Sequence, residues 1–165
     1  MLKMHSDHSG TGTDLTKIKF DSNCVKTNSN LTELIDEKIQ NHKRFYGIEI
    51  LPKSNKILDY TKLTVQPLFT SIVWLSDEYS DNDLLATNAA VQCAQKLQEN
   101  GLSVLPHLTC HRMTQEQLQE YLKNIVKPRN LLVLRGDQVL ANQQWKYANE
   151  MVQVVKELRS GFFFF

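Results

Sequence analysis

The stretch SVLPHLTCHRMTQEQLQEYLKNIVKPRNLLVLRGD, residues 103–137, holds two short apolar runs on either side of a helix-period segment. Residues 103–108 form a short, mostly apolar run, which is typical of a strand. Residues 131–134 are wholly apolar, as expected of a parallel strand that is covered on both faces. The stretch therefore predicts a strand, a crossover helix and a second strand parallel to the first.

The middle of this stretch carries start and stop signals for a helix. Thr114 and Gln117 form a capping pair, in which each side chain bonds the backbone N–H of the other residue. Leu118 and Leu122 share one helical face, and Pro128 cannot continue the helix. These signals place a helix between the two strands.

The same alternation extends on both sides of this unit. Ser80 with Asp83 resembles a helix start, Gly101 a helix stop, and Pro52 a strand end. Four βα units in succession favour a parallel sheet, which belongs either to a barrel or to a doubly wound fold. The remaining expected elements are a helix over 30–42, a strand over 45–51, a weak helix over 53–63, a strand over 68–75, a helix over 84–100 and a last helix over 144–159.

The glycine motifs separate the two folds. No G-x-G-x-x-G and no G-x-x-x-x-G-K-[ST] follows any predicted strand, so the usual dinucleotide and phosphate fingerprints are absent. We therefore predict an α/β fold, namely the first four βα units of a (β/α)8 TIM-type barrel. A complete barrel takes about 250 residues, and this chain has 165. We expect a partial barrel with two open sheet edges that invite pairing with another chain.

The two ends of the chain differ from the middle. Residues 1–29 are polar with few large apolar groups, so we expect a disordered tail. Residues 30–160 form the predicted half-barrel. Gly161 and four phenylalanines, residues 161–165, stand where a fifth strand would begin, and we interpret them as an exposed, aberrant end.

Composition excludes several classes of partner. The net charge of +1 gives no field that selects nucleic acid, and no run reaches the roughly 20 apolar residues that span a bilayer. Three cysteines and no secretory signal argue against a disulfide framework and favour the cytoplasm. We expect the partner to be a small-molecule substrate or another protein.

Chemistry-bearing side chains gather at the predicted strand ends. Glu49 lies late in the first strand, Trp74 ends the second, His107 ends the third, and Arg135 and Asp137 follow the fourth. The carboxyl ends of barrel strands form the catalytic face. Cys110 and His111 adjoin His107; because no second ligand cluster with zinc spacing occurs, we expect no metal site.

Five strings together resemble the methylenetetrahydrofolate reductase family. They are YGIEILPK (46–53), IVWL (72–75), HLTCHRMT (107–114), LLVLRGD (131–137) and KYANEMV (146–152). The family's pattern is a strand F-E-F-F-P-P, a strand end T-W, then H-L-T-C, and L-R-G-D followed by Y-A. The resemblance implies a barrel enzyme in which NADPH or NADH reduces FAD, and the flavin then reduces 5,10-methylenetetrahydrofolate to 5-methyltetrahydrofolate.

The resemblance also implies roles for residues. Glu49 matches the general acid that helps to open the folate's methylene bridge, a role that an apolar strand environment would favour. His107 matches a flavin-contacting histidine, and Val73 and Trp74 match the strand end near flavin and folate. Without the resemblance, a core histidine that bonds a backbone carbonyl is the better explanation of His107.

The other implied positions follow the fourth strand. Arg135, Gly136 and Asp137 match the turn that binds FAD, where Asp137 also contacts the folate. Tyr147 and Ala148 match residues beside the adenine or ribose of FAD; ordinary helix packing is their alternative explanation.

Two departures from the pattern touch the site. Lys53 stands where the family has a second proline, and Val73 where it has a threonine hydroxyl. Together with the short length, they leave open a non-catalytic truncated isoform that binds flavin or pairs with another chain, including a homo-oligomer. A different barrel enzyme, such as a proline dehydrogenase relative or an aldolase, is a further alternative.

Overall fold

A computed structural model describes residues 30–52, 59–74, 88–124, 130–137, 140–159 and 161–165. The predicted tail, residues 1–29, lies outside this part of the chain. The elements are α1 (Leu31–Gln40), β1 (Gly47–Ile50), a 3-10 helix (Tyr60–Lys62), β2 (Phe69–Ile72), α2 (Ala89–Glu99), β3 (Val104–Thr109), α3 (Gln115–Asn124), β4 (Asn130–Leu134), α4 (Ala148–Leu158) and β5 (Phe163–Phe164).

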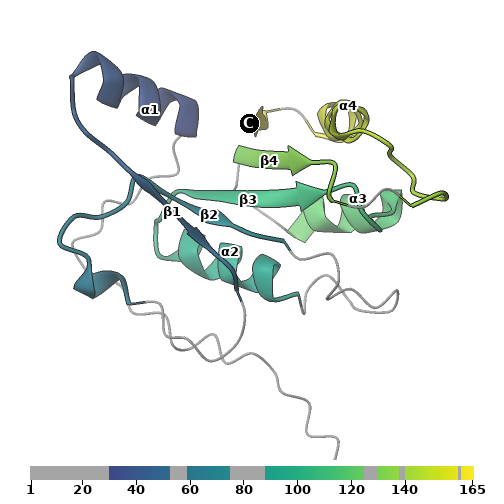
Figure 1. Cartoon of the computed structure of the whole chain (residues 1–165), viewed down its shortest axis with the longest axis horizontal. Coiled ribbons are helices and arrows are strands. Elements are labelled where there is room, and N and C mark those ends of the chain that lie inside the picture. The colour runs from purple at the N-terminus through teal and green to yellow at the C-terminus, as the bar shows by residue number, and fades with distance from the viewer. Residues whose placement is uncertain (1–29, 53–58, 75–87, 125–129, 138–139, 160) are drawn as a thin grey trace, which may run out of the picture.

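The strands form one parallel sheet in the order β1-β2-β3-β4-β5 (Figure 1). Every neighbouring pair is parallel, and α2, α3 and α4 follow β2, β3 and β4. Consecutive strands that lie side by side with helical crossovers confirm the α/β fold class and agree with part of a barrel. The strand number of a closed barrel stays a prediction.

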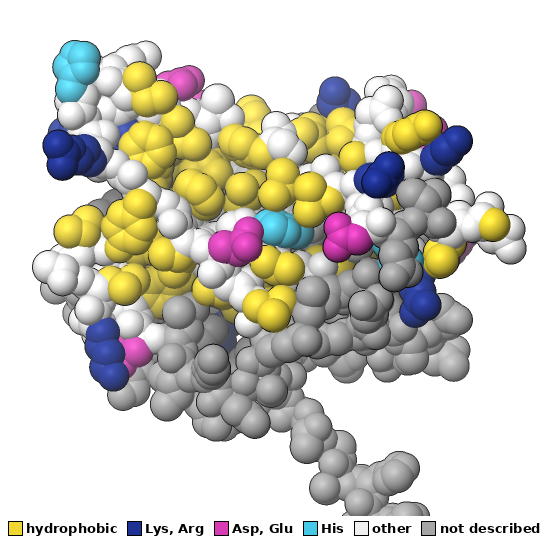
Figure 2. All heavy atoms as spheres, viewed as in Figure 1, with side chains coloured by type: hydrophobic (Ala, Val, Ile, Leu, Met, Phe, Trp, Pro, Cys, Tyr) yellow, Lys and Arg dark blue, Asp and Glu magenta, His cyan; other side chains and the backbone are white. Residues whose placement is uncertain are grey.

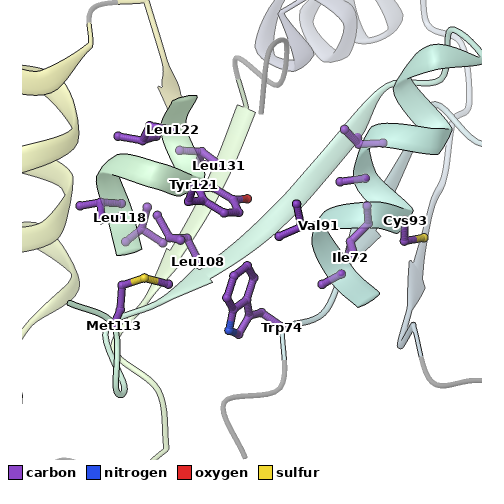
Figure 3. Packing of buried hydrophobic residues seen from close by; sticks show 14 of the residues in the cluster. Ile72, Trp74, Val91, Cys93, Leu108, Met113, Leu118, Tyr121, Leu122 and Leu131 are labelled. Atoms are coloured by element: carbon purple, nitrogen blue, oxygen red, sulfur yellow. The ribbon is translucent and has the colours of Figure 1, made fainter. Parts of the chain in front are cut away.

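The face of the sheet toward the helices is a continuous apolar core. Side chains alternate between the two faces of a strand, and Ile72, Leu108 and Leu131 are fully buried on the helical side. Leu108 and Leu131 lie beside Leu118 and Tyr121 of α3, which are also fully buried, and Ile72 lies beside Val91 of α2 (Figure 3). This apolar layer occupies one face of the sheet. Polar side chains of β1 to β4 can therefore lie on the opposite face.

The predicted signals around α3 are confirmed. The Thr114 N–H donates to Gln117 Oε1 at 2.9 Å, and the Gln117 N–H donates to Thr114 Oγ1 at 3.2 Å. Leu118 and Leu122 face the core as expected. Gly101 has φ +80° after α2, which is the left-handed stop that the sequence predicted.

Helix starts were predicted less well than helix ends. The helix expected from residue 84 begins at Ala89, where Asn88 Oδ1 accepts the N–H groups of Ala90 and Val91. Ser80 and Asp83 lie outside the described residues.

The last helix also begins later than predicted, at Ala148 rather than near residue 144. The Glu150 carboxylate accepts the N–H groups of Lys146 and Tyr147 and so organises the chain just before the helix. Gln144 instead accepts the Gln115 N–H at 2.8 Å. Of the weak helix predicted over 53–63, the structure describes residues 59–63. These residues contain a 3-10 turn, Tyr60–Lys62, in place of an α-helix.

The phenylalanine-rich end differs from its predicted role as an exposed end. Phe163 and Phe164 form β5 and pair with Asn130 and Leu131 of β4. The Arg159 guanidinium lies 5.5 Å from the Phe162 ring centroid, and Lys156 Nζ lies 5.6 Å from that of Phe164. Cations over the rings and the β4 edge hold this segment against the sheet, and three of its four phenylalanines are half-buried.

Within the described residues, no helix is both long and apolar enough to cross a membrane.

The buried position of Leu118 gives a stability test. We expect Leu118→Ala to lower the free energy of unfolding by about 2–5 kcal/mol, since it leaves a cavity between α3 and the sheet. Urea denaturation measures the loss. Lys123→Ala, on the exposed side of α3, should change stability by less than about 0.5 kcal/mol; equal losses for the two variants would show that α3 does not pack as described.

Candidate active site at the carboxyl ends of the strands

The parallel register brings three polar groups to one face. Glu49 of β1 is level with Ser71 of β2, and Ser71 is level with Leu105 of β3. His107 is two residues after Leu105, so its side chain lies on the same face one step nearer the carboxyl ends. The sheet thus places Glu49, Ser71 and His107 together on the side away from α2 and α3.

Their distances show direct interaction. His107 Nε2 lies 2.7 Å from Ser71 Oγ, a hydrogen bond, and 3.7 Å from Glu49 Oε2. His107 and Ser71 are each 7% exposed. The sequence therefore correctly grouped Glu49 with His107, but it missed Ser71, which alternation along the FTSI strand would have placed beside them.

Glu49 is more open than predicted. Its side chain is 64% exposed, whereas that of His107 is 8% exposed. The expected apolar surroundings of the carboxyl are not supplied by the described residues, because β1 lies at the edge of the sheet. In Figure 2, a histidine lies between two acidic side chains in the middle of an otherwise largely apolar face.

Burial controls the charge of His107. Desolvation lowers the pKa of His107 below its ordinary 6.5, and the negative charge of Glu49 opposes this shift with a smaller effect. The ring is therefore neutral at pH 7. The contact of 3.7 Å to Glu49 is accordingly a contact between a carboxyl group and a neutral imidazole, and becomes an ion pair only on protonation.

The turn after β4 is built around Gly136. Gly136 has φ +88°, and a Cβ atom on it would lie 2.8 Å from Thr109 Oγ1 and 3.0 Å from His111 Cβ. Thr109 Oγ1 also accepts the His111 N–H at 3.3 Å. A residue without a side chain is thus required for the turn to pass close to the end of β3; Thr109 is a second residue whose structural role the sequence did not reveal.

Arg135 and Asp137 flank this glycine and are exposed. Leu134, just before them, is paired with Thr109 at the end of β3. The guanidinium of Arg135 makes a long hydrogen bond of 3.4 Å to the Gly136 carbonyl. Both charged groups therefore stand at the same end of the sheet as His107, with donors and acceptors available to a ligand.

Val73 and Trp74, which were expected near the flavin and the folate, differ from each other in position. Trp74 is buried on the helical side, where its ring meets Tyr121 edge to face at a centroid distance of 5.4 Å (Figure 3). Val73 is half-buried, and its N–H donates to Ile50 O at 2.9 Å. The structure thus leaves Trp74 apart from the Glu49 and His107 group, because alternate residues of a strand point to opposite faces.

Tyr147 and Ala148 stand at the start of α4. The Tyr147 ring is 49% exposed, with Lys146 Nζ 5.4 Å from its centroid. Ala148 is half-buried and packs against the core. Packing accounts for Ala148, while the exposed ring of Tyr147 remains available to a ligand.

The described residues contain no group of three His, Cys, Asp or Glu side chains that could hold a metal ion. Cys110 is fully buried. Burial, with a smaller contribution from the negative charge of Glu150, raises the pKa of its thiol to about 11. Metal ligation needs the thiolate, which this environment disfavours.

The crowded turn predicts that a methyl group at position 136 destabilises the fold. Gly136→Ala should lower the free energy of unfolding by more than Gly161→Ala. Gly161 has φ +91° but nothing within 4 Å of its Cβ position, so its variant measures backbone strain alone, roughly 1–2 kcal/mol. Thermal or urea denaturation of both variants makes the comparison; equal losses would show that the Thr109 contact is not tight.

The buried imidazole predicts a pH dependence. As pH falls through about 6.5, the unfolded chain binds a proton at this histidine before the folded chain does, so the free energy of unfolding decreases. The stability that the neutral His107 contributes is fully present above that pH and is lost as the pH falls below it. Urea denaturation at about pH 7.5 and about pH 5.5 should show a smaller difference in His107→Gln than in the wild type. An unchanged difference would mean that His107 is not desolvated.

Comparison with known families identifies a match to most of the chain. The family model described as methylenetetrahydrofolate reductase matches residues 34–163. A comparison with curated proteins finds no match. The matched region includes all five strands as far as Phe163 and every site residue discussed above. The chain therefore belongs to the methylenetetrahydrofolate reductase family.

Proposed function

We propose that this chain contributes to the FAD-dependent reduction of 5,10-methylenetetrahydrofolate to 5-methyltetrahydrofolate with NADPH or NADH. Membership of the family implies folate reduction, and hence oxidoreductase activity, in general terms. The observation that supports the specific reaction best is the juxtaposition of Glu49 of β1 with His107 of β3, 3.7 Å apart across β2 on one face of the sheet. A carboxyl group beside a neutral imidazole can hold and pass on a proton.

The residues of this face fit a flavin in their chemistry. A flat, largely apolar ring system with polar edges suits an apolar sheet face that carries a few hydrogen-bonding groups. His107 and Val73 would adjoin the ring, Arg135 would pair with a phosphate or ribityl group, and Gly136 permits close approach of the backbone. Asp137, Tyr147 and Ala148 would lie toward the rest of the cofactor. The chemistry that bound FAD supplies is hydride transfer from the nicotinamide to the folate.

Glu49 is proposed as the general acid toward the folate. Its exposed carboxyl can reach a substrate over the open face, and Asp137 is a second group that could contact the folate. Protonation of the substrate nitrogen by Glu49 would open the methylene bridge to the iminium that accepts hydride. Trp74, in contrast, would act by packing the end of β2 against Tyr121.

A second candidate function is a non-catalytic form that pairs with another chain. The 64% exposure of the Glu49 side chain favours it, because a general acid works best where water is excluded. Exposed apolar residues near β1 point the same way, namely Phe45 (39%), Tyr46 (39%) and Leu51 (45%). In this form a partner chain, or a second copy, would cover the face.

Purification of the full chain with FAD tests the first function. We expect stoichiometric flavin, bleaching of its absorption by NADPH or NADH, and reoxidation by methylenetetrahydrofolate. Glu49→Gln should keep the flavin and lower the folate-dependent rate by about 10²–10⁴-fold, the usual contribution of general acid catalysis. Glu99→Gln, an exposed change at the end of α2, should keep the full rate.

A folded sample that binds no flavin would contradict the first function. Flavin without reoxidation by folate, together with a dimeric mass in solution, would favour the second candidate. The proposed cytoplasmic location is tested separately by fractionation.

A further inference from the structure

Ser71 is a buried polar partner of His107 and lies level with Glu49 in the sheet. Its hydroxyl lies 2.7 Å from His107 Nε2, and both residues are 7% exposed, so little water is available to replace this hydrogen bond. Ser71 is also held on both sides by the sheet, opposite Glu49 of β1 and Leu105 of β3. The imidazole is thus anchored by a rigid strand rather than by a loop.

A hydroxyl can serve either state of the neutral imidazole. A serine hydroxyl donates one hydrogen bond and accepts others, and its hydrogen rotates to suit its partner. When Nε2 carries hydrogen, Ser71 Oγ accepts; when Nε2 carries a lone pair, Ser71 donates. The ring therefore keeps its place whichever tautomer it adopts.

The charge of Glu49 selects between these two states. An ionised carboxylate only accepts hydrogen bonds, so it favours hydrogen on Nε2. A protonated carboxyl has lost this negative charge and no longer favours hydrogen on Nε2, so that nitrogen can accept from Ser71 Oγ instead. Glu49 is the group whose charge acts on the imidazole, and its Oε2 faces the same nitrogen that Ser71 contacts.

We propose that Ser71 is a positioning residue, which holds Nε2 of His107 toward the Glu49 carboxyl through both protonation states of Glu49. This inference rests on the proposed function, in which Glu49 loses and regains a proton in each turnover. Ser71 need not touch the folate or the flavin. Its hydroxyl lets the imidazole change tautomer when Glu49 gains or loses a proton, while the ring keeps its orientation.

Nitrogen NMR of the full, isotopically labelled chain tests the anchoring without any ligand. His107→Gln assigns the ring signals. In the wild type we expect separate Nδ1 and Nε2 signals of one dominant tautomer above the pKa of the ring. Ser71→Ala should shift the Nε2 signal away from its wild-type position, because that nitrogen loses its hydrogen bond, and Ser71→Thr, which keeps a hydroxyl, should restore it.

A matched control lies on the opposite face of the same strand. Thr70 Oγ1 makes a buried hydrogen bond of 2.6 Å to the Tyr60 hydroxyl, so Thr70→Val also removes one hydroxyl from the interior of β2. It should leave the His107 ring signals unchanged. If Ser71→Ala does not fold, Ser71→Cys, whose thiol is a weak hydrogen-bonding group, replaces it. Wild-type ring signals in the folded Ser71→Ala or Ser71→Cys variant would overturn the proposal.

Coupling to Glu49 is the second readout. Glu49→Gln removes the charge that raises the pKa of His107, so the titration midpoint of the ring should fall. In the Ser71→Ala background this fall should shrink, because Nε2 no longer faces residue 49. An equal fall in both backgrounds would contradict the positioning role.

The reductase assay separates this inference from the proposed function. With FAD, NADPH and methylenetetrahydrofolate, Ser71→Ala should lower kcat about tenfold and leave KM nearly unchanged, a smaller loss than removal of the general acid itself. Thr70→Val should keep the wild-type kcat. If the chain shows no folate reduction but the NMR results hold, the proposed function fails and the anchoring of His107 stands; if turnover is normal in Ser71→Ala, the positioning role fails and the proposed function stands.

Discussion

The alternation of side chains along β1, β2 and β3, combined with their parallel register, is the constraint on which the site depends. Because Ile72 and Leu108 must enter the core under the helices, Ser71 and His107 must face the other way. A slip of one residue would exchange the two sets and bury polar groups under α3. The hydrophobic layer thus fixes the orientation of the polar site, although it contains none of the polar groups.

The same arrangement gives two neighbouring titratable groups different environments. His107 lies in the third strand of five, where side chains from both sides exclude water, so its neutral form is favoured. Glu49 lies on the edge strand and is exposed. A neutral imidazole beside an accessible carboxyl group is suited to proton transfer toward a bound substrate, which is the contribution that the proposed reaction asks of the protein.

Packing also limits where a ligand can approach. Gly136 has no side chain because Thr109 and His111 occupy the space that one would need. The turn therefore follows the end of β3 closely, and it exposes Arg135 and Asp137 at the carboxyl end of the sheet. Trp74 belongs to the supporting layer, where it fills the space between β2 and α3. An aromatic residue at a strand end is thus as well explained by packing as by ligand binding.

The sequence by itself determined the order of strands and helices, the parallel sheet and the family, because these depend on local apolar runs, capping pairs and motifs spaced along the chain. Glu49 and His107 were likewise placed at the same end of the sheet, since the carboxyl ends of parallel strands lie together. Helix starts at Asn88 and Tyr147 were misjudged, because several polar residues there can cap equally well and only the fold selects one.

Only the tertiary structure decided the partnership of Ser71 with His107, the exposure of Glu49 and the burial of Trp74. Each of these depends on which face a side chain occupies and on what covers that face. The pairing of β5 with β4 was decided in the same way, because Phe163 and Phe164 form a strand only where the edge of β4 lies beside them, with Lys156 of α4 over the Phe164 ring. Such contacts join residues far apart in the chain, so no local pattern encodes them.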